Sequence, residues 1–249
     1  MHSRILVLGT YTCGKTGRLL AKELGADYAS QSVWTEEQYD LIIRYGNSFA
    51  GLPPKRKHVM NEARHIMVTA NKPSMRFKLL GHGVSAPALY DENTIDKAEY
   101  PIIARPANHW KGKHFNLVYN RADAQVFINK GYYLQEVINK DTEFRLFILL
   151  DKIIEASIKV PASVNSNEMI RNANGGWLFN QYPVAELPRE LKHHARMAAE
   201  LGNLAFCAID CCVDVKGIPY IFEINSAPSL IPRKVTKLAT RIKEAYNLH

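Results

Sequence analysis

Three oxygen-bearing side chains late in the sequence have the types and spacing of a metal site. Asp210 lies within the apolar segment "AFCAIDCCVDV", and Glu223 and Asn225 lie within "IPYIFEIN", beyond a turn at Lys216-Gly217. Residues two apart on a strand share a face, so Glu223 and Asn225 project together, and the turn brings Asp210 alongside them. Two carboxylates and an amide oxygen suit Mg²⁺ that bridges nucleotide phosphates. The alternative is a solvated sheet face, which the apolar flanks disfavour because buried carboxylates need partners.

A second candidate site is the stretch "GTYTCGKT", from Gly9 to Thr16, which matches the P-loop pattern between a strand-like and a helix-like segment. A P-loop enzyme also needs an acidic residue at the end of a neighbouring parallel strand. Asp151 ends "LFILLD", but "KIIEASIKV" follows at once, which predicts a hairpin turn rather than a parallel crossover. Glycine-rich turns are also common structural devices in α/β domains. A P-loop kinase or NTPase using Gly9–Thr16 stays open as an alternative enzyme.

Length and composition limit the classes of protein that remain. A chain of 249 residues with 47% hydrophobic and 22% charged residues is typical of a globular protein with a full core. No segment approaches the ~20 apolar residues of a membrane span, and no signal-peptide pattern is expected at the N-terminus. The four cysteines show no C-x-x-C spacing, which favours buried reduced thiols and a cytoplasmic location. The net charge of +8 favours anionic partners, and it leaves open a non-catalytic basic module that binds nucleotide or nucleic acid.

The elements that would position these residues alternate at first as in an α/β protein. Strands are expected at 5–8, 26–30 and 39–44, a helix at 16–24, and a turn-rich basic connector at 51–57, where the basic run "PPKRKH" (53–58) is expected to be a solvated loop. Two helices then cover 61–83, and Gly81 and Gly83 end the second one. Strands dominate afterwards, at "YPIIARP", "LVYN", "YYLQEVI" and a hairpin of "EFRLFILL" with "IIEASIKV" joined at Asp151-Lys152. A helix at 188–201, two strands around the turn at Lys216-Gly217 and a helix at 233–246 complete the chain.

From residue 61 to residue 230 the sequence resembles the ATP-grasp superfamily, and within it the ribosomal-protein glutamate ligases and the phage-type carboxylate–amine ligases. The segments that carry the resemblance are, in order, "NKPSMRFKLLGHGVSAP", "YLQEVI", "EFRLFILLDKIIEASIKV", "IRNANGGW" and "FEINSAPSL". The resemblance implies an α/β fold with α+β lobes. A small N-terminal α/β domain (1–60) would precede a central ATP-grasp lobe (61–130) and a C-terminal lobe with the hinge and the metal site (131–249).

The resemblance also implies a role for each candidate residue. Metal ligation falls to Asp210, Glu223 and Asn225. The residues expected to contact ATP are Lys72, Arg105, Lys113, Gln135, Glu136, Ile138, Glu143 and Asn172. Those expected near the terminal phosphate and the acyl group are Arg145, Arg171 and Asn174, and those expected near the acceptor substrate are Thr10 and Lys15.

Two features depart from the pattern of these families. Arg105 stands where they place a lysine, so a guanidinium replaces a compact ammonium group at a phosphate contact. The flap segment "NHWKGKHF" has a single glycine, so Lys113 and its basic neighbours would hold phosphate by charge.

The activity that the resemblance implies is ATP-dependent ligation of a carboxylate to an amine. The carboxylate attacks the γ-phosphoryl group and becomes an acyl phosphate; the amine then displaces phosphate and forms an amide or peptide bond, with release of ADP and phosphate. ATP is required with Mg²⁺, or with Mn²⁺ in its place. Expected partners are amino acids, peptides or proteins, acidic ones among them, whereas nucleic acid and membrane are not expected. The protein would act through charge neutralisation and alignment.

Overall fold

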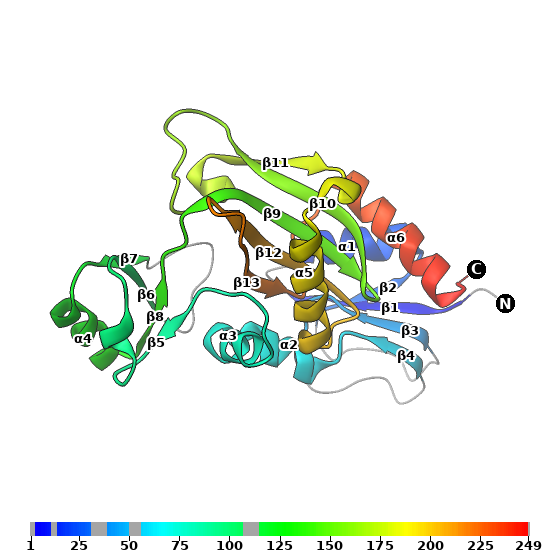
Figure 1. The fold of residues 1–249 in the computed structure, drawn as a ribbon. Coiled ribbons are helices and arrows are strands. Elements are labelled where there is room, and N and C mark those ends of the chain that lie inside the picture. Colours follow the sequence, from blue (N-terminus) through cyan, green and yellow to red (C-terminus); the bar gives the residue numbers. More distant parts are fainter. Residues whose placement is uncertain (1–2, 11–13, 31–38, 50–55, 107–114, 249) are drawn as a thin grey trace. The chain divides into compact units, whose positions relative to one another are not determined.

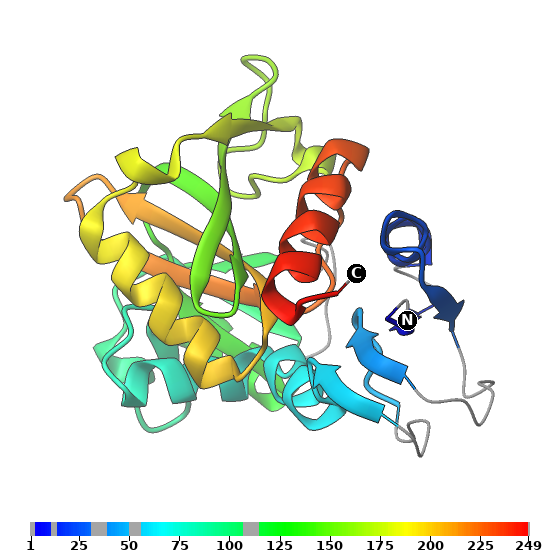
Figure 2. The same ribbon diagram turned by 90° about the vertical axis from the view of Figure 1, so that its right-hand side faces the viewer.

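The computed structural model describes residues 3–10, 14–30, 39–49, 56–106 and 115–248. The chain forms two compact units (Figures 1 and 2). The first unit comprises Met1–Val68, Asn203–Cys207 and Asn225–His249, and the second comprises Thr69–Gly202 and Ala208–Ile224. The division into three parts at residues 60 and 130 stays a prediction.

A parallel four-stranded sheet forms the centre of the first unit. Its order is β2-β1-β3-β4, with β1 at Ile5–Leu8, β2 at Asp27–Ala29, β3 at Tyr39–Arg44 and β4 at Arg56–Met60. The central strands β1 and β3 are almost wholly buried, which explains their continuous apolar sequences. Helices α1 (Gly14–Leu24) and α6 (Pro232–Tyr246) pack against each other (Figure 2). The three strands and both helices expected here are confirmed.

The prediction of a connector at 51–57 is wrong for the C-terminal end of that range. Residues 50–55 lie outside the described part, but β4 begins at Arg56 and pairs in parallel with β3 at the sheet edge. Lys57 and His58 are exposed on this edge strand, whereas Met60 is buried. The exposed residues of β4 are polar and basic, as in a loop, so the sequence did not reveal the strand.

A small antiparallel sheet in the second unit has the order β5-β8-β6-β7. Its strands are β5 (Leu89–Tyr90), β6 (Ile102–Pro106), β7 (Asn116–Val118) and β8 (Tyr132–Glu136). Helix α4 (Arg121–Asn129) covers one face (Figure 1), over a core of Ile95, Ile102, Ala104, Val118, Ala124 and Leu134. This helix was missing from the expected series of strands, although Asn120 caps it by accepting a hydrogen bond from the Asp123 N–H at 2.9 Å.

A larger sheet in the second unit has the order β11-β10-β9-β12-β13. The strands are β9 (Lys140–Leu149), β10 (Lys152–Pro161), β11 (Trp177–Tyr182), β12 (Phe206–Asp214) and β13 (Pro219–Asn225). The hairpin of β9 and β10 is confirmed; its turn is Leu150-Asp151, because Lys152 already pairs with Leu149. Strand β11 was not expected. Cys207, Cys211 and Cys212 are buried and free in β12, as predicted.

Two further helices belong to the second unit, and a third, of which residues 63–68 belong to the first unit, precedes them in the chain. Helix α5 (Arg189–Gly202) contacts β9 and β10, and the side that it buries carries Leu191, Ala195, Ala198, Ala199 and Gly202. Helices α2 (Ala63–Ala70) and α3 (Lys72–Gly81) follow one another directly, as expected. The Asn71 side chain accepts a hydrogen bond from the Ser74 N–H at 3.2 Å and so fixes the first turn of α3. This turn begins at Lys72, and Arg76 follows one turn later on the same side of the helix.

Because the Asn71 cap fixes the start of α3, its loss should lower stability. We expect Asn71→Ala to reduce the free energy of unfolding by about 1 kcal/mol, and Asn71→Ser to retain most of the stability. Urea denaturation of the three proteins measures the difference. Equal midpoints for Asn71→Ala and the parent would show that the cap contributes nothing.

Candidate functional site

The predicted metal ligand Asp210 lies in the middle of β12, paired with an arginine from the neighbouring strand. Arg145 of β9 donates from Nε to Asp210 Oδ1 at 2.9 Å and from Nη2 to Oδ2 at 2.7 Å. Lys159 Nζ of β10 lies 3.6 Å from Asp210 Oδ1. The two cations also lie over the ring of Phe179, at 5.0 and 5.4 Å from its centroid. Asp210 is thus a buried carboxylate held by two cations.

Glu143 extends this charge network along β9. Its carboxylate accepts from Lys159 Nζ through Oε1 and from Lys140 Nζ, at 2.9 Å, through Oε2. Glu143 and Lys159 are 5% and 7% exposed, so both charges are paired within the protein. In this structure Glu143 acts first as a partner of two lysines, while its predicted contact with ATP stays a prediction.

The pairing shifts the pKa values of Asp210, Arg145 and Lys159 in the directions that stabilise their charged forms. Burial alone would raise the pKa of Asp210, but Arg145 and Lys159 outweigh it and lower that pKa from 3.8 to about 2. Burial would likewise lower the pKa values of Arg145 and Lys159, whereas Asp210 raises both. All three groups are therefore charged at neutral pH.

Glu223, the second predicted metal ligand, lies on β13 and pairs with the first residue of α3. Lys72 Nζ donates to Glu223 Oε2 at 3.0 Å, and both side chains are partly exposed. Glu223 also contributes, after Asp210, to the raised pKa of Arg145, so the two carboxylates act on one guanidinium. Asn225 ends β13 but belongs to the first unit, and its role as a third ligand stays a prediction.

The expected nucleotide-binding strands β6 and β8 present polar residues on the face opposite α4. Arg105 pairs in register with Tyr133, and Ile103 with Gln135. Burial raises the pKa of Tyr133, whereas Arg105 lowers it by charge and by a hydrogen bond. The guanidinium of Arg105 lies 5.2 Å from the centroid of the Phe115 ring. Gln135 is only 6% exposed, and its side-chain oxygen accepts a hydrogen bond from Arg76.

Glu136 is the last residue of β8, and Ile138 lies in the link from β8 to β9, where the hinge is predicted. Glu136 Oε2 accepts from the Ala88 N–H at 3.0 Å, and the Ala88 carbonyl accepts from the Glu136 N–H at 3.0 Å. The Glu136 side chain thus fixes the neighbouring chain segment. Ile138 is half-buried just before β9.

Arg171, Asn172 and Asn174 lie in the segment before β11. Arg171 donates to the carbonyls of Asp141 and Lys140 at 2.9 and 3.1 Å, and it stacks over the Trp177 ring at 4.7 Å. Asn172 accepts from the Gly175 N–H at 2.8 Å, which caps a single 3₁₀ turn (η2, Ala173–Gly175), while Asn174 is exposed. Arg171 therefore anchors this segment to the start of β9.

Thr10 and Lys15 flank a loop of which residues 11–13 lie outside the described part, and Lys15 is exposed on α1. Strand β2 supplies Tyr28, whose ring packs against the first motif glycine. A Cβ added at Gly9 would lie 2.8 Å from Tyr28 Cε2. The glycine of the P-loop-like motif is therefore required by a close side chain, which is a structural reason for its presence.

The strands beside β1 give no further support to the P-loop alternative. The end of β3 next to Gly9 carries buried Arg44, rather than an acid, and Asn47 beyond it donates to the Gly9 carbonyl at 2.8 Å. Asp151 lies in the antiparallel β9–β10 turn with φ of +63°, as the sequence predicted. A P-loop enzyme places an acidic residue at the end of a parallel strand beside its loop. Within the described residues, neither the end of β3 nor Asp151 supplies such an acid.

Lys159 and Arg76 are residues of the site that the sequence did not reveal. Lys159 is the shared partner of Glu143 and Asp210, and Arg76 bonds to Gln135 and to the carbonyl of Phe222. The signal for Arg76 was its spacing of one helical turn from Lys72. Lys113, by contrast, lies outside the described residues.

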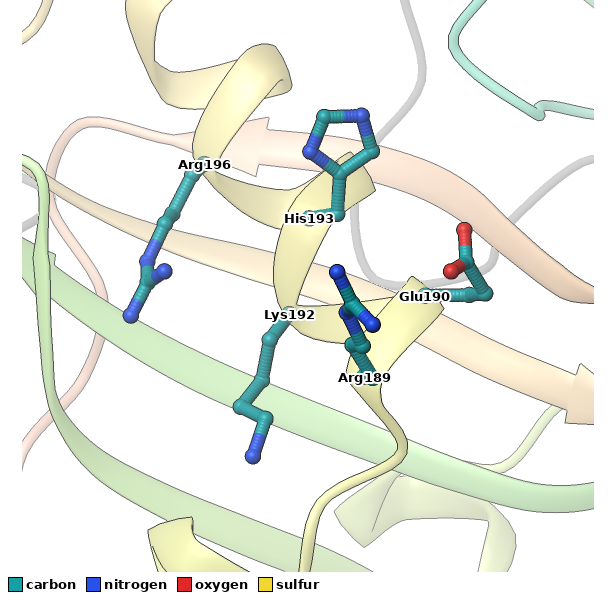
Figure 3. A pocket seen from close by; sticks show the side chains of 5 residues that line it. All are labelled: Arg189, Glu190, Lys192, His193 and Arg196. Carbon is teal, nitrogen blue, oxygen red and sulfur yellow. The ribbon is translucent and has the colours of Figure 1, made fainter.

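A hollow of about 440 Å³ lies on α5, away from these residues, and its lining is Arg189, Glu190, Lys192, His193 and Arg196. Its polar groups do not converge, because Lys192 and Arg196 extend to one side, and His193 and Glu190 point elsewhere (Figure 3). Lys192 Nζ also donates to the Ala185 carbonyl at 3.3 Å. The hollow lacks the common focus of a substrate site.

Two other features, a metal cluster and a membrane-spanning helix, are absent from the described residues. Over the described ranges, no three His, Cys, Asp or Glu side chains lie together in a way that could hold a metal ion. The predicted metal site differs from such a group, because it consists of two carboxylates and one amide. The described helices include none long and apolar enough to cross a membrane.

Comparison with solved structures defines the class of the fold. No known protein family and no curated protein matches this chain by sequence. Solved structures of ATP-grasp ligases match it over nearly its full length, so the chain has the ATP-grasp fold, and the fold class expected from the sequence is confirmed.

Three of these structures illustrate the likeness. The ATP-grasp ligase PsnB, complexed with a minimal precursor, gives a TM-score of 0.73 at 12% identity over 98% of this chain and 99% of that chain. The macrocyclase MdnC, bound with precursor peptide MdnA from Microcystis aeruginosa MRC, gives 0.68 at 12% over 97% and 99%. D-alanine–D-alanine ligase from Bacillus anthracis gives 0.70 at 16% over 98% and 97%. The narrower resemblance to glutamate ligases of ribosomal protein stays a prediction.

The lowered pKa of Asp210 predicts how stability depends on pH. A carboxyl group with a depressed pKa stabilises the fold above its unfolded pKa, and this contribution is lost as pH falls towards the folded value. We expect the parent to lose more stability than Asp210→Asn as pH falls from 5, with a difference that approaches about 2 kcal/mol as the pH nears 2. Urea denaturation at closely spaced pH values measures this difference. Parallel pH profiles would contradict the pairing.

Proposed function

We propose that this protein is an ATP-dependent carboxylate–amine ligase whose active centre lies around Asp210, Glu223 and Arg145. The observation that carries the proposal is that each predicted carboxylate ligand is paired with basic groups, Asp210 with Arg145 and Lys159, and Glu223 with Lys72. An assembly of hard oxygen donors and basic groups is what a magnesium-bound polyphosphate requires. The ATP-grasp fold supports the same assignment.

The side chains fit Mg²⁺, or Mn²⁺ in its place, by their chemistry. Asp210 and Glu223 would supply carboxylate oxygens, and Asn225, the last residue of β13, would supply an amide oxygen. When bound, the metal would neutralise charge on the phosphates. Each carboxylate already has a basic partner, so binding would exchange an ammonium or guanidinium for the metal as its counter-charge.

The chain's own groups would then act on the substrates by charge and position. Arg145 and Lys72, which pair with the two carboxylates, would supply positive charge to phosphate oxygens, and Arg105 would add charge from β6. In the proposed reaction a substrate carboxylate attacks the γ-phosphoryl group, and an amine then displaces phosphate from the acyl phosphate. No general base among the described residues is required, because alignment and charge neutralisation supply the catalysis.

The proposed substrates are a carboxylate and an amine borne by amino acids, peptides or proteins. Solved ATP-grasp neighbours are complexed with precursor peptides, and D-alanine–D-alanine ligase is named for a small amino acid, so both sizes are represented. We place the protein in the cytoplasm, because three buried free cysteines suit a reducing compartment.

The proposal is tested by the requirements for ADP release. In a screen of amino acids and short peptides, we expect ADP release to require ATP, Mg²⁺, an acid and an amine together. Glu223→Gln should lower turnover by at least about 100-fold with the melting temperature nearly unchanged, because it removes a metal-binding charge rather than packing. Near-normal ADP release by this variant would refute the metal assignment.

Two substitutions separate the ligase from a P-loop enzyme. In the ligase, Arg105→Ala should weaken ATP binding by about 2–4 kcal/mol, and Arg105→Lys should recover part of the loss. Lys15→Ala should leave ATP affinity within about three-fold and raise the KM of the acceptor instead. Calorimetry with ATP on all three variants decides between the readings. Loss of ATP binding in Lys15→Ala, with retention in Arg105→Ala, would restore the P-loop.

A further inference from the structure

Arg76 is a buried arginine that joins the two sheets of the second unit. Its Nη1 donates to Gln135 Oε1 on β8 at 3.0 Å, and its Nη2 donates to the Phe222 carbonyl on β13 at 2.6 Å. The residue is only 5% exposed. One strand of the small sheet and one strand of the large sheet are therefore held by a single side chain from α3.

The chemistry of the contact requires a guanidinium. Its planar fork presents several N–H donors in fixed directions, so it can bond two acceptors on different strands at once. A lysine ammonium on a flexible stem holds two such acceptors less well. Both acceptors here are neutral, so the contact works through direction rather than through ion pairing.

Burial of this cation has a cost that the structure only partly offsets. Burial lowers the pKa of Arg76 from 12.5 to about 10; Arg105 lowers it as well, whereas Tyr133 and Glu223 raise it. The guanidinium is still protonated at neutral pH.

Arg76 also determines how the amide of Gln135 is oriented. A guanidinium has donors only, so the amide oxygen faces Arg76 and the Nε2–H₂ group faces away. On β13, the bonded Phe222 carbonyl immediately precedes Glu223 in the chain. Arg76 therefore fixes two parts of the predicted ATP site. One is the side chain of Gln135, which is predicted to border the base. The other is the backbone next to Glu223, which is predicted to bind metal.

We propose that Arg76 is a positioning residue that couples the base side of the ATP site, at Gln135, to the metal side, at Glu223. This inference rests on the proposed function. Arg76 acts through its two neighbours and does not touch the substrates. Lys72, one turn earlier on α3, bonds Glu223 directly, so one helix sets both ends of the site.

The test compares substitutions at Arg76 with a matched change elsewhere. Arg76→Met should weaken Mg–ATP binding by roughly 10- to 100-fold, because two buried acceptors lose a charged donor. Arg76→Lys should recover part of this loss. Arg196→Met, which removes an exposed arginine from α5, should bind Mg–ATP within about two-fold of the parent. Calorimetry gives the affinities, and steady-state assays should show an unchanged KM for the amine.

A second variant keeps the test decisive if Arg76→Met folds poorly. Gln135→Leu removes the same hydrogen bond and leaves the arginine in place, so it should also weaken Mg–ATP binding. In the double variant the two losses should add to less than their sum, because both break one linkage. Additive losses, or parent-like affinity in Arg76→Met, would overturn the coupling.

These outcomes distinguish the inference from the proposed function. A parent protein that binds Mg–ATP, with Arg76→Met equal to it, overturns the inference and leaves the proposed function intact. A parent protein that does not bind Mg–ATP overturns the proposed function, and the inference that rests on it.

Discussion

The bidentate pair of Arg145 and Asp210 inside the large sheet is the interaction on which the rest of the site depends. Charges out of water are tolerated only when each has a partner and its hydrogen bonds are made. Removal of either partner would leave an uncompensated buried ion, so β9 and β12 must stay adjacent. Lys159 and Glu143 extend the same requirement to β10. The sheet is therefore built around its charges as much as around its apolar core.

A single irregularity in β10 brings Lys159 into this network. Near the turn Ile153 pairs with Ile148, but further along Ser157 pairs with Arg145, because the register shifts between Ile153 and Glu155. A shift of one residue exchanges the two faces of a strand. Without the bulge, Lys159 would lie on the face opposite Arg145, and Asp210 would lose its second cation. Local backbone geometry thus sets the charge balance of the site.

This explains how much of the molecule the sequence predicts. Strands and helices with strong apolar periodicity, such as β1, β12 and α5, were expected within a few residues of their bounds. Edge strand β4 and short helix α4 were missed because only part of each is buried. Lys159 could not be predicted, since no residue pattern announces the bulge. The spacing of Arg76 from Lys72 places both on one side of α3, but the acceptors of Arg76 could not be predicted, because they lie 59 and 146 residues away along the chain.

The same contrast explains why the glycine motif near the N-terminus says less than it first suggests. A short motif is satisfied by local needs, and at Gly9 the ring of Tyr28 already gives a reason for glycine. The ATP-grasp segments are spread over the chain, and no local need relates Lys72, Arg145 and Asp210. Yet Lys72 binds Glu223, and Arg145 binds Asp210 through two hydrogen bonds. Residues that only the fold can bring together are therefore the stronger evidence for a shared chemical role.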